Sequence, residues 1–174
     1  MTSNSELAHV MLKPDTLKSG LRDVVLRELV ECAGEPVASL RLTLSLRQIE
    51  AVYPNFPNLR ARPFIFKYFT TEETEHFAFL GEPGLHHRMH ETKGRTGSGK
   101  GIRGKYYTRY TRLSPSELDQ WLQGALSAEA EIDLEMFGRD ILHIADSPVD
   151  SLRGLNAIIG VERVSRVAAS GRQS

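Results

Sequence analysis

The sequence has a single cysteine, Cys32, among 174 residues, which excludes an internal disulfide and a cysteine-rich zinc site. So little cysteine is typical of a reducing compartment, and we expect a cytoplasmic protein. Long apolar runs are also missing: no segment approaches the roughly 18 apolar residues that a membrane-spanning helix needs. The first residues lack the basic and then apolar pattern of a signal peptide, so we expect neither a membrane protein nor a secreted one.

The sequence also lacks a net charge, because 22 Lys and Arg side chains balance 22 Asp and Glu side chains. This balance excludes a whole-molecule basic field for nucleic acid or anionic lipid, so such binding would need a local patch. The 40% hydrophobic and 25% charged fractions are those of an ordinary globular protein. The length suits one domain with an insertion, and we assign residues 1–174 to a single domain.

The periodicity of apolar residues predicts strands and helices in alternation. Ser114-Pro115-Ser116-Glu117 is a capping box with proline at the first helical position, and Ser147-Pro148 is a second helix start. We predict strands over 7–12, 37–44, 74–81, 141–144 and 161–167, and helices over 21–32, 45–53, 63–69, 114–126 and from 147 onward. This order favours an α+β fold with helices over one sheet.

Residues 93–112 break this pattern, because they hold seven cationic side chains and no acidic one. Within them, Gly94, Gly99 and Lys100 match the glycine and lysine positions of a phosphate-binding P-loop. Gly101 stands where that motif needs a magnesium-binding serine or threonine, and no predicted strand leads into it. We therefore expect a flexible glycine-rich loop whose cations and backbone N–H groups suit a polyphosphate.

The same basic segment carries Tyr106, Tyr107 and Tyr110 between its cations. Aromatic rings interleaved with cations are typical of surfaces that bind single-stranded nucleic acid, because bases stack on the rings. The alternative is a solvated surface loop followed by an edge strand. The absence of net charge weakens the nucleic-acid interpretation.

Three histidines, His86, His87 and His90, lie close together in the sequence. In a helix, His86 and His90 would share one face and form half of a metal site. No obvious carboxylate or cysteine completes such a site, and Gly84 argues against a long helix there. We therefore predict that these are surface histidines.

His143 lies in the apolar run 141–144, shortly before Asp146-Ser147. A lone histidine in such a run is typically a core residue. Arg139 and the basic loop change this interpretation, because neighbouring cations disfavour the imidazolium and keep the ring neutral. A neutral ring nitrogen can attack phosphorus and carry a phosphoryl group, so His143 is the candidate nucleophile.

Taken together, the motifs resemble the nucleoside diphosphate kinase family over most of the chain and in the order of that family. The segments that carry the resemblance are Met11-Leu12-Lys13-Pro14-Asp15, Tyr53, Arg62-Pro63-Phe64 with Lys67-Tyr68, Glu91-Thr92, Gly101-Ile102-Arg103-Gly104, and Gly138-Arg139-Asp140-Ile141-Leu142-His143 with Asp146-Ser147. Their joint order and spacing are far more specific than any one of them.

The resemblance implies a ferredoxin-like βαββαβ antiparallel sheet covered by helices, assembled as a homo-oligomer. It implies ping-pong transfer of the γ-phosphoryl group of ATP to a nucleoside diphosphate, with His143 as the phosphorylated residue. The nucleotide-binding residues that it implies are Lys13, Tyr53, Phe64, Arg88, Thr92, Arg103 and Asp140. Mg²⁺ would accompany the nucleoside triphosphates and diphosphates, with Asp146 reaching the ion through water.

Several departures from the family pattern surround the expected nucleophile. Asp140 replaces an asparagine, Ala145 removes a hydroxyl, and residues 152–155 lack the glutamate that orients the histidine in the family. Arg103 and His143 are 39 residues apart, so we assign residues 105–136 to an inserted helical segment. We therefore predict a divergent member of the family.

Three functional hypotheses follow. The first is a phosphotransferase that uses His143. The second is a nucleotide-binding regulatory or low-activity homologue without efficient turnover, which would bind nucleotide and transfer nothing. The third is a nucleic-acid-binding module that uses residues 93–112, whose binding would fall steeply with salt and would not need His143. We rank them in that order.

Overall fold

The computed structural model describes residues 5–54, 60–96, 98–107, 113–127, 140–160, 162–164 and 166. Their four strands form one antiparallel sheet in the order β2-β3-β1-β4. The strands are β1 (Glu6–Leu12), β2 (Ala38–Thr43), β3 (Glu73–Gly81) and β4 (Leu142–Ile144). This order is that of a ferredoxin-like βαββαβ fold, which confirms the expected fold class.

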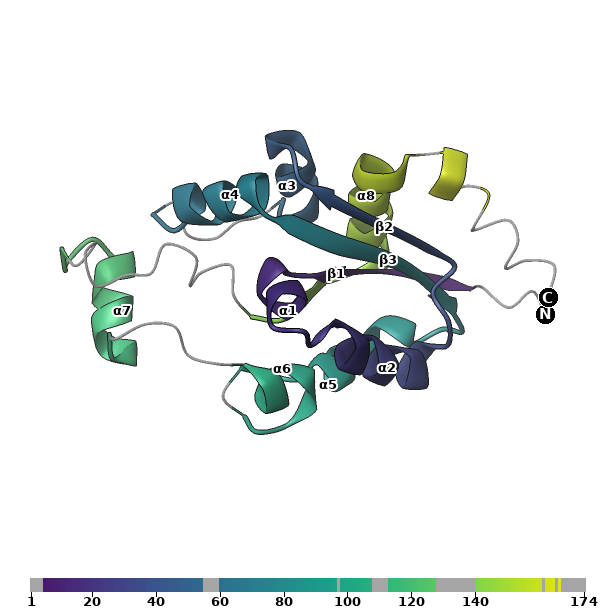
Figure 1. Cartoon of the computed structure of the whole chain (residues 1–174), viewed down its shortest axis with the longest axis horizontal. Helices are drawn as coiled ribbons and strands as arrows, with labels where there is room; N and C mark the ends of the chain where they lie inside the picture. The colour runs from purple at the N-terminus through teal and green to yellow at the C-terminus, as the bar shows by residue number, and fades with distance from the viewer. Residues whose placement is uncertain are drawn as a thin grey trace.

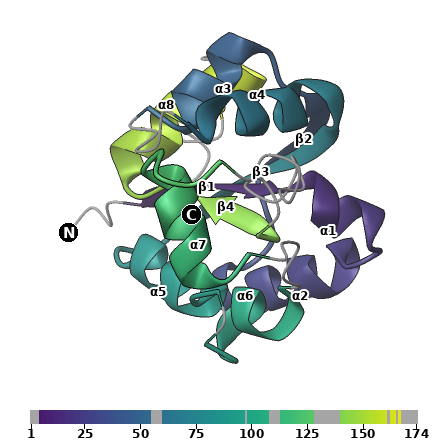
Figure 2. The ribbon, with the colours of Figure 1, turned by 90° about the vertical axis from the view of Figure 1, so that its left-hand side faces the viewer.

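Helices cover both faces of the sheet (Figures 1 and 2). On one face lie α3 (Leu46–Val52), α4 (Arg62–Thr71) and α8 (Pro148–Ile159); on the other lie α2 (Arg22–Ala33), α5 (Leu85–Lys93) and α6 (Gly101–Tyr106). The short α1 (Pro14–Lys18) follows β1, and α7 (Pro115–Leu122) lies at the end of the molecule, beyond α4 (Figure 1). Within the described residues, no helix combines the length and the apolar character needed to span a membrane.

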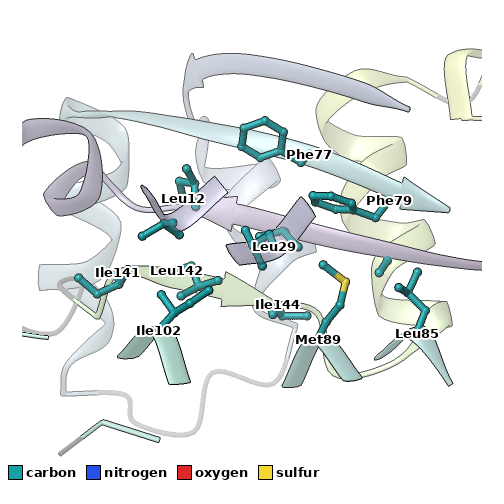
Figure 3. Close-up of a cluster of buried hydrophobic side chains, with 13 residues drawn as sticks. Leu12, Leu29, Phe77, Phe79, Leu85, Met89, Ile102, Ile141, Leu142 and Ile144 are labelled. Atoms are coloured by element: carbon teal, nitrogen blue, oxygen red, sulfur yellow. The ribbon is translucent and has the colours of Figure 1, made fainter. Parts of the chain in front are cut away.

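The central strand β1 sends alternate side chains to the two faces, as the period of a strand requires. Ala8, Val10 and Leu12 are fully buried in the larger core, against β3, β4, α2 and α5 (Figure 3). Met11 is buried in the second core, with side chains of α3, α4 and α8. His9 and Lys13, two residues on either side of Met11, share the face of Met11. His9 of β1 and Lys13 directly after it therefore lie on the face that α8 covers.

The histidine cluster lies in the nine-residue helix α5, where Gly84 argued against a long helix. Gly84 precedes the helix with φ 89° and does not interrupt it. The carboxylate of Glu6 accepts hydrogen bonds from the backbone N–H groups of Gly84 (2.6 Å), Leu85 (3.0 Å) and His86 (3.3 Å). A residue of β1 thus satisfies the unpaired donors that begin a helix. No local sequence signal could reveal this cap.

Three further elements differ from the prediction. Gly101–Tyr106 forms a helix where a loop and an edge strand were expected, with Ile102 fully buried in the larger core. Residues 162–164 are helical and not a strand, because Val164 N–H bonds to Gly160 O (3.2 Å) and the side chain packs on Leu155. Helix α7 ends at Leu122, earlier than expected. Much of the predicted insertion 105–136 and Arg139 lie outside the described residues.

The larger core provides a test of the fold. Met89 of α5 is fully buried there, so Met89→Ala should lower the free energy of unfolding by about 2–5 kcal/mol, through lost burial and a cavity. Urea unfolding followed by circular dichroism measures the change. Val149→Ala, at a side chain 72% exposed on α8, is the control and should change stability by less than about 0.5 kcal/mol. Equal effects of the two variants would contradict this packing.

Candidate active site

A cluster of charged side chains forms where β1 ends and β4 begins. The Asp140 carboxylate pairs with the Lys13 ammonium through one oxygen and with the Arg103 guanidinium (2.5 Å) through the other. Arg103 also donates to Leu142 O (2.7 Å), which fixes α6 against β4. Lys13 is buried, and burial alone would lower its pKa, but Asp140 and Tyr53 together outweigh burial and raise it. Lys13 is therefore a fixed positive charge at neutral pH.

The backbone that leads into β4 is held in an unusual conformation. Ile141 has φ 73°, a left-handed value that a β-branched residue rarely adopts. Its N–H donates to Asp15 Oδ2 (3.0 Å), its carbonyl oxygen accepts from Lys13 N–H (3.0 Å), and Thr16 Oγ1 donates to the same carbonyl. Burial raises the pKa of Asp15, although the Ile141 N–H opposes this. The turn after Lys13 thus fixes where β4 begins.

His143, in the middle of β4, lies opposite Met11 of β1. Its half-buried ring packs against the ring of Tyr53, with centroids 4.6 Å apart. Tyr53 itself lies beside Lys13, whose ammonium is 5.8 Å from the centre of the tyrosine ring. His143 Nε2 is buried and has no hydrogen-bond partner among the described residues, while the side chain as a whole is half-buried. The structure therefore brings together Lys13, Tyr53, Arg103 and Asp140 with His143.

The surroundings of His143 disfavour its protonated form. Burial lowers its pKa well below the ordinary value, and the positive charges of Lys13, Lys93 and Arg103 lower it further. The ring is thus neutral at physiological pH, with a lone pair on one nitrogen. A neutral imidazole beside a cationic cluster is suited to attack an anionic, electrophilic group that the cations hold.

Lys93, at the end of α5, joins this cluster, and the sequence analysis did not single it out. With Arg103, His90 and Arg95 it lines an open hollow of about 570 Å³. Burial lowers the Lys93 pKa to about 8, and the Arg103 charge acts in the same direction. Its place directly after Thr92 in the basic segment was the available signal. The hollow thus presents Lys93, Arg95 and Arg103 to an anion.

Two of the predicted nucleotide-binding residues lie apart from the cluster. Arg88 is exposed on α5, and its guanidinium contacts Pro83 O (3.4 Å) at the start of the helix. Thr92 lines a separate hollow between α2 and α6, together with Glu28 and Lys105. Their proposed contacts with phosphate stay predictions, and Lys93 occupies the side of α5 that faces Arg103.

Phe64, the predicted contact of the base, packs against the inserted segment. Its ring lies 5.5 Å from that of Trp121 in α7, and Leu113 and Leu122 complete a small apolar cluster. Arg60 stacks on Trp121 at 4.4 Å and donates to the carbonyl oxygen of the same residue. One side of Phe64 is therefore occupied by α7, and base stacking on this ring stays a prediction.

The histidine cluster differs from the expectation of surface residues. His86 is buried, with Nδ1 2.5 Å from Glu6 Oε1 and Nε2 2.9 Å from Ser151 Oγ. His90 Nε2 contacts Ala145 O (3.1 Å), and only His87 is exposed. The described residues contain no group of three or more histidine, cysteine or acidic side chains that could hold a metal ion. His86 and His90 thus tie α5 to α8 and β4.

Asp146 is an exposed carboxylate in the connection from β4 to α8, and its charge acts on both His90 and Lys93. Mg²⁺ typically binds one or two carboxylates together with substrate phosphates, and keeps several waters. Among the described residues Glu91 lines the cationic hollow, while the charge of Asp146 acts on Lys93, which also lines it. The contact of Asp146 with Mg²⁺ through water stays a prediction.

The fold of the chain has counterparts among solved structures. The chain superimposes on the nucleoside diphosphate kinase of Encephalitozoon cuniculi with a TM-score of 0.65 and 16% identity, over 90% of each chain. For the kinase of Borrelia burgdorferi, solved with vanadate and ADP as a transition-state mimic, the TM-score is 0.64 with 15% identity, over 88% of this chain and 86% of that one. For the kinase of Aquifex aeolicus it is 0.59 with 17% identity, over 88% and 94%.

These likenesses show that the chain has the fold of nucleoside diphosphate kinases. No family model matches the sequence, and no curated protein matches it either. The predicted resemblance is thus confirmed at the level of the fold, while the roles of individual residues rest on the geometry above.

The pKa of Lys93 predicts a pH dependence of anion binding. Because the side chain loses its proton near pH 8, the affinity for inorganic tripolyphosphate should fall about tenfold between pH 7 and pH 9. Isothermal titration calorimetry measures this fall. Lys93→Arg keeps its charge at pH 9, so it should lose much less affinity, while changes in the ligand's own ionisation affect both proteins alike. Parallel losses in the two proteins would contradict the assignment.

Proposed function

We propose that this protein transfers a phosphoryl group between nucleotides through a phosphohistidine at His143. The observation that carries the proposal is a neutral, half-buried imidazole at His143 on which the charges of Lys13, Lys93 and Arg103 act. The fold shared with nucleoside diphosphate kinases supports it, as does the ADP and vanadate in one of those structures. Phosphoryl transfer needs chiefly positioning and neutralisation of charge, which such a site supplies.

In the first half-reaction, the Nδ1 lone pair of His143 attacks the γ-phosphorus of a nucleoside triphosphate. The N–P bond forms as the bond to the β–γ bridging oxygen breaks, and the electron pair leaves with the nucleoside diphosphate. In the second half-reaction, a terminal oxygen of another diphosphate attacks the same phosphorus and the N–P bond breaks. Nδ1 regains its lone pair, and the protein returns to its starting state.

The cations hold the phosphates during both steps. Lys13, Lys93 and Arg103 face the anionic oxygens, where electrostatic stabilisation in a partly dry site is strong. Asp146 would hold Mg²⁺ through water, and the ion would supply positive charge that offsets the charge of the phosphates. Nucleoside triphosphates and diphosphates are thus the proposed partners. The homo-oligomer implied by the family resemblance stays a prediction.

Asp140 favours a second candidate, a nucleotide-binding protein with slow turnover. Its carboxylate pairs with Lys13 and Arg103 in the absence of nucleotide, so an incoming phosphate must displace it or approach a negative charge. A carboxylate accepts a hydrogen bond from a sugar hydroxyl but cannot donate one to a phosphate. The same residue that stabilises the free site therefore opposes binding of the anion.

The phosphohistidine gives the first test of this function. Incubation with γ-labelled ATP should yield an acid-labile, alkali-stable phosphoprotein, and His143→Ala should abolish it because no nitrogen remains to attack phosphorus. His87→Ala removes an exposed histidine of α5, 78% accessible, and should keep the label. Absence of label in folded wild-type protein that binds ADP would establish the slow-turnover candidate instead.

Asp140→Asn tests the competition between carboxylate and phosphate. The neutral amide leaves Lys13 and Arg103 free to pair with the ligand, so the affinity for ADP should rise about tenfold, or about 1.4 kcal/mol. Calorimetric titration with ADP and Mg²⁺ measures the affinity. Asp150→Asn removes a carboxylate that pairs with Arg153 on α8 and should leave binding unchanged. Weaker binding by Asp140→Asn would mean that the carboxylate contributes to recognition.

A further inference from the structure

Lys93 differs from the other five lysines of the chain in its surroundings. Two of them, Lys67 and Lys100, are exposed. The remaining three pair with carboxylates: Lys13 with Asp140, Lys18 with Glu72, and Lys105 with Glu28. Lys93 is half-buried, and its ammonium has neither an ion-pair nor a hydrogen-bond partner among the described residues. It is thus the lysine whose positive charge has the least support.

The contact between two glycines fixes Lys93 beside Arg103. Gly94 follows α5 with φ 67°, and Gly101 begins α6 with φ 65°. A Cβ atom on Gly94 would collide with the backbone at the start of α6, and one on Gly101 would lie 2.7 Å from Thr92 O. A larger residue at either position would force the two segments apart. The hollow that Lys93 and Arg103 line is therefore built into the fold.

Burial and charge both favour the neutral amine of Lys93. Burial lowers its pKa to about 8, and the positive charges of Arg103 and Lys13 act in the same direction, against Asp146 and Asp140. About a quarter of the side chains are therefore neutral at pH 7.5, compared with about one in a thousand for an ordinary lysine. A desolvated lysine next to another cation is one of the activated nucleophiles that proteins use.

The hollow beside Lys93 offers a place for an anionic leaving group. Arg95 and Arg103 line it, together with the titratable side chains of His90 and Glu91. A guanidinium matches a phosphate group with several N–H donors, and its charge does not depend on pH in this range. A molecule whose reactive carbon is bonded to phosphate would thus present that carbon to the Lys93 amine. Acyl phosphates are the class of compound with this property.

We propose that Lys93 is an acylation site, which takes the acyl group of small acyl phosphates bound in this hollow. The amine nitrogen attacks the carbonyl carbon, and an N–C bond forms. The bond between this carbon and the phosphate oxygen breaks, and its electron pair leaves with the phosphate. The nitrogen releases one proton to water, so the products are an amide and inorganic phosphate. Arg95 and Arg103 stabilise the negative charge that grows on the leaving phosphate.

Acylation removes a positive charge from the candidate active site. The amide is neutral at every pH, so a bound polyphosphate loses one of the three cations of the hollow. The acylation step needs only the hollow and its cations, whereas this consequence for nucleotides rests on the proposed function. Acyl phosphates would thereby lower the affinity of the site for nucleotides.

Peptide mass spectrometry after incubation with acetyl phosphate at pH 7.5 compares all six lysines within one protein. Lys93 should be acetylated at least about tenfold faster than the exposed Lys67 and Lys100. Its rate should rise from pH 7 to pH 8 and level off above pH 9, where the amine is fully neutral. Inorganic tripolyphosphate, which competes for the hollow, should suppress acetylation of Lys93 alone. Equal rates at the three lysines, or no effect of tripolyphosphate, would overturn the proposal.

Arg95→Ala separates binding of the phosphate from reactivity of the amine. It should slow acetylation of Lys93 by acetyl phosphate about 3- to 10-fold. Acetylation by acetic anhydride, which carries no phosphate, should stay nearly unchanged. Arg27→Ala, at an exposed arginine of α2 beside a different hollow, is the matched control and should change neither rate. Equal slowing with both reagents would show that Arg95 acts on the amine, and would overturn binding of the acyl phosphate.

The affinity for ADP tests the consequence. Acetyl phosphate treatment should lower it about tenfold in the wild-type protein, through the loss of one charge. Lys93→Arg has no amine to acetylate and should keep its affinity, and equal losses in the two proteins would refute the effect on nucleotides. Acetylation is measured without ATP. Selective acetylation of a protein that never forms phosphohistidine would therefore uphold the acylation site and refute only the phosphotransferase.

Discussion

The pairing of β1 with the three-residue strand β4 is the constraint on which the site depends. It places His143 opposite Met11, on the same face as Lys13 and His9. Because successive side chains of a strand alternate, a register shift of one residue would send the imidazole to the opposite, apolar face. The turn after Lys13 prevents such a shift, since Asp15 and Thr16 hold both polar backbone groups of Ile141.

Burial and charge then act on the histidine in the same direction. The ring is half-buried among cations, and both effects favour its neutral form. Lys13 shows the opposite balance, because Asp140 and Tyr53 together outweigh the effect of burial on its pKa. The site therefore combines a neutral imidazole with permanent positive charge nearby.

Local signals in the sequence were sufficient to predict most of the helices and strands. The capping boxes at Ser45 and Ser114 begin α3 and α7, and Ser147 with proline begins α8, because these interactions lie within four residues of chain. Helix α5 was not predictable, since its cap is the carboxylate of Glu6, 78 residues earlier than Gly84. A contact of that kind exists only once β1 lies beside α5.

The residues of the candidate site were likewise predictable only in part from the sequence. The motif order and spacing indicated Lys13, Arg103, Asp140 and His143, and the structure gathers them. Lys93 could not be ranked above its basic neighbours from sequence, because its importance comes from the side of α5 on which it lies. The partners of His9 were equally hidden: His76 lies 67 residues away on β3, and only the sheet register brings the rings together.

The left-handed backbone of Ile141 also affects how the sheet ends. β4 is an edge strand, and exposed edges invite pairing with the backbone of other molecules. Ile141 departs from extended geometry immediately before the strand, and Pro148 lacks a donor soon after it, so β4 offers only a short ladder to another chain. The conformation that positions the histidine thus also protects this side of the sheet against aggregation.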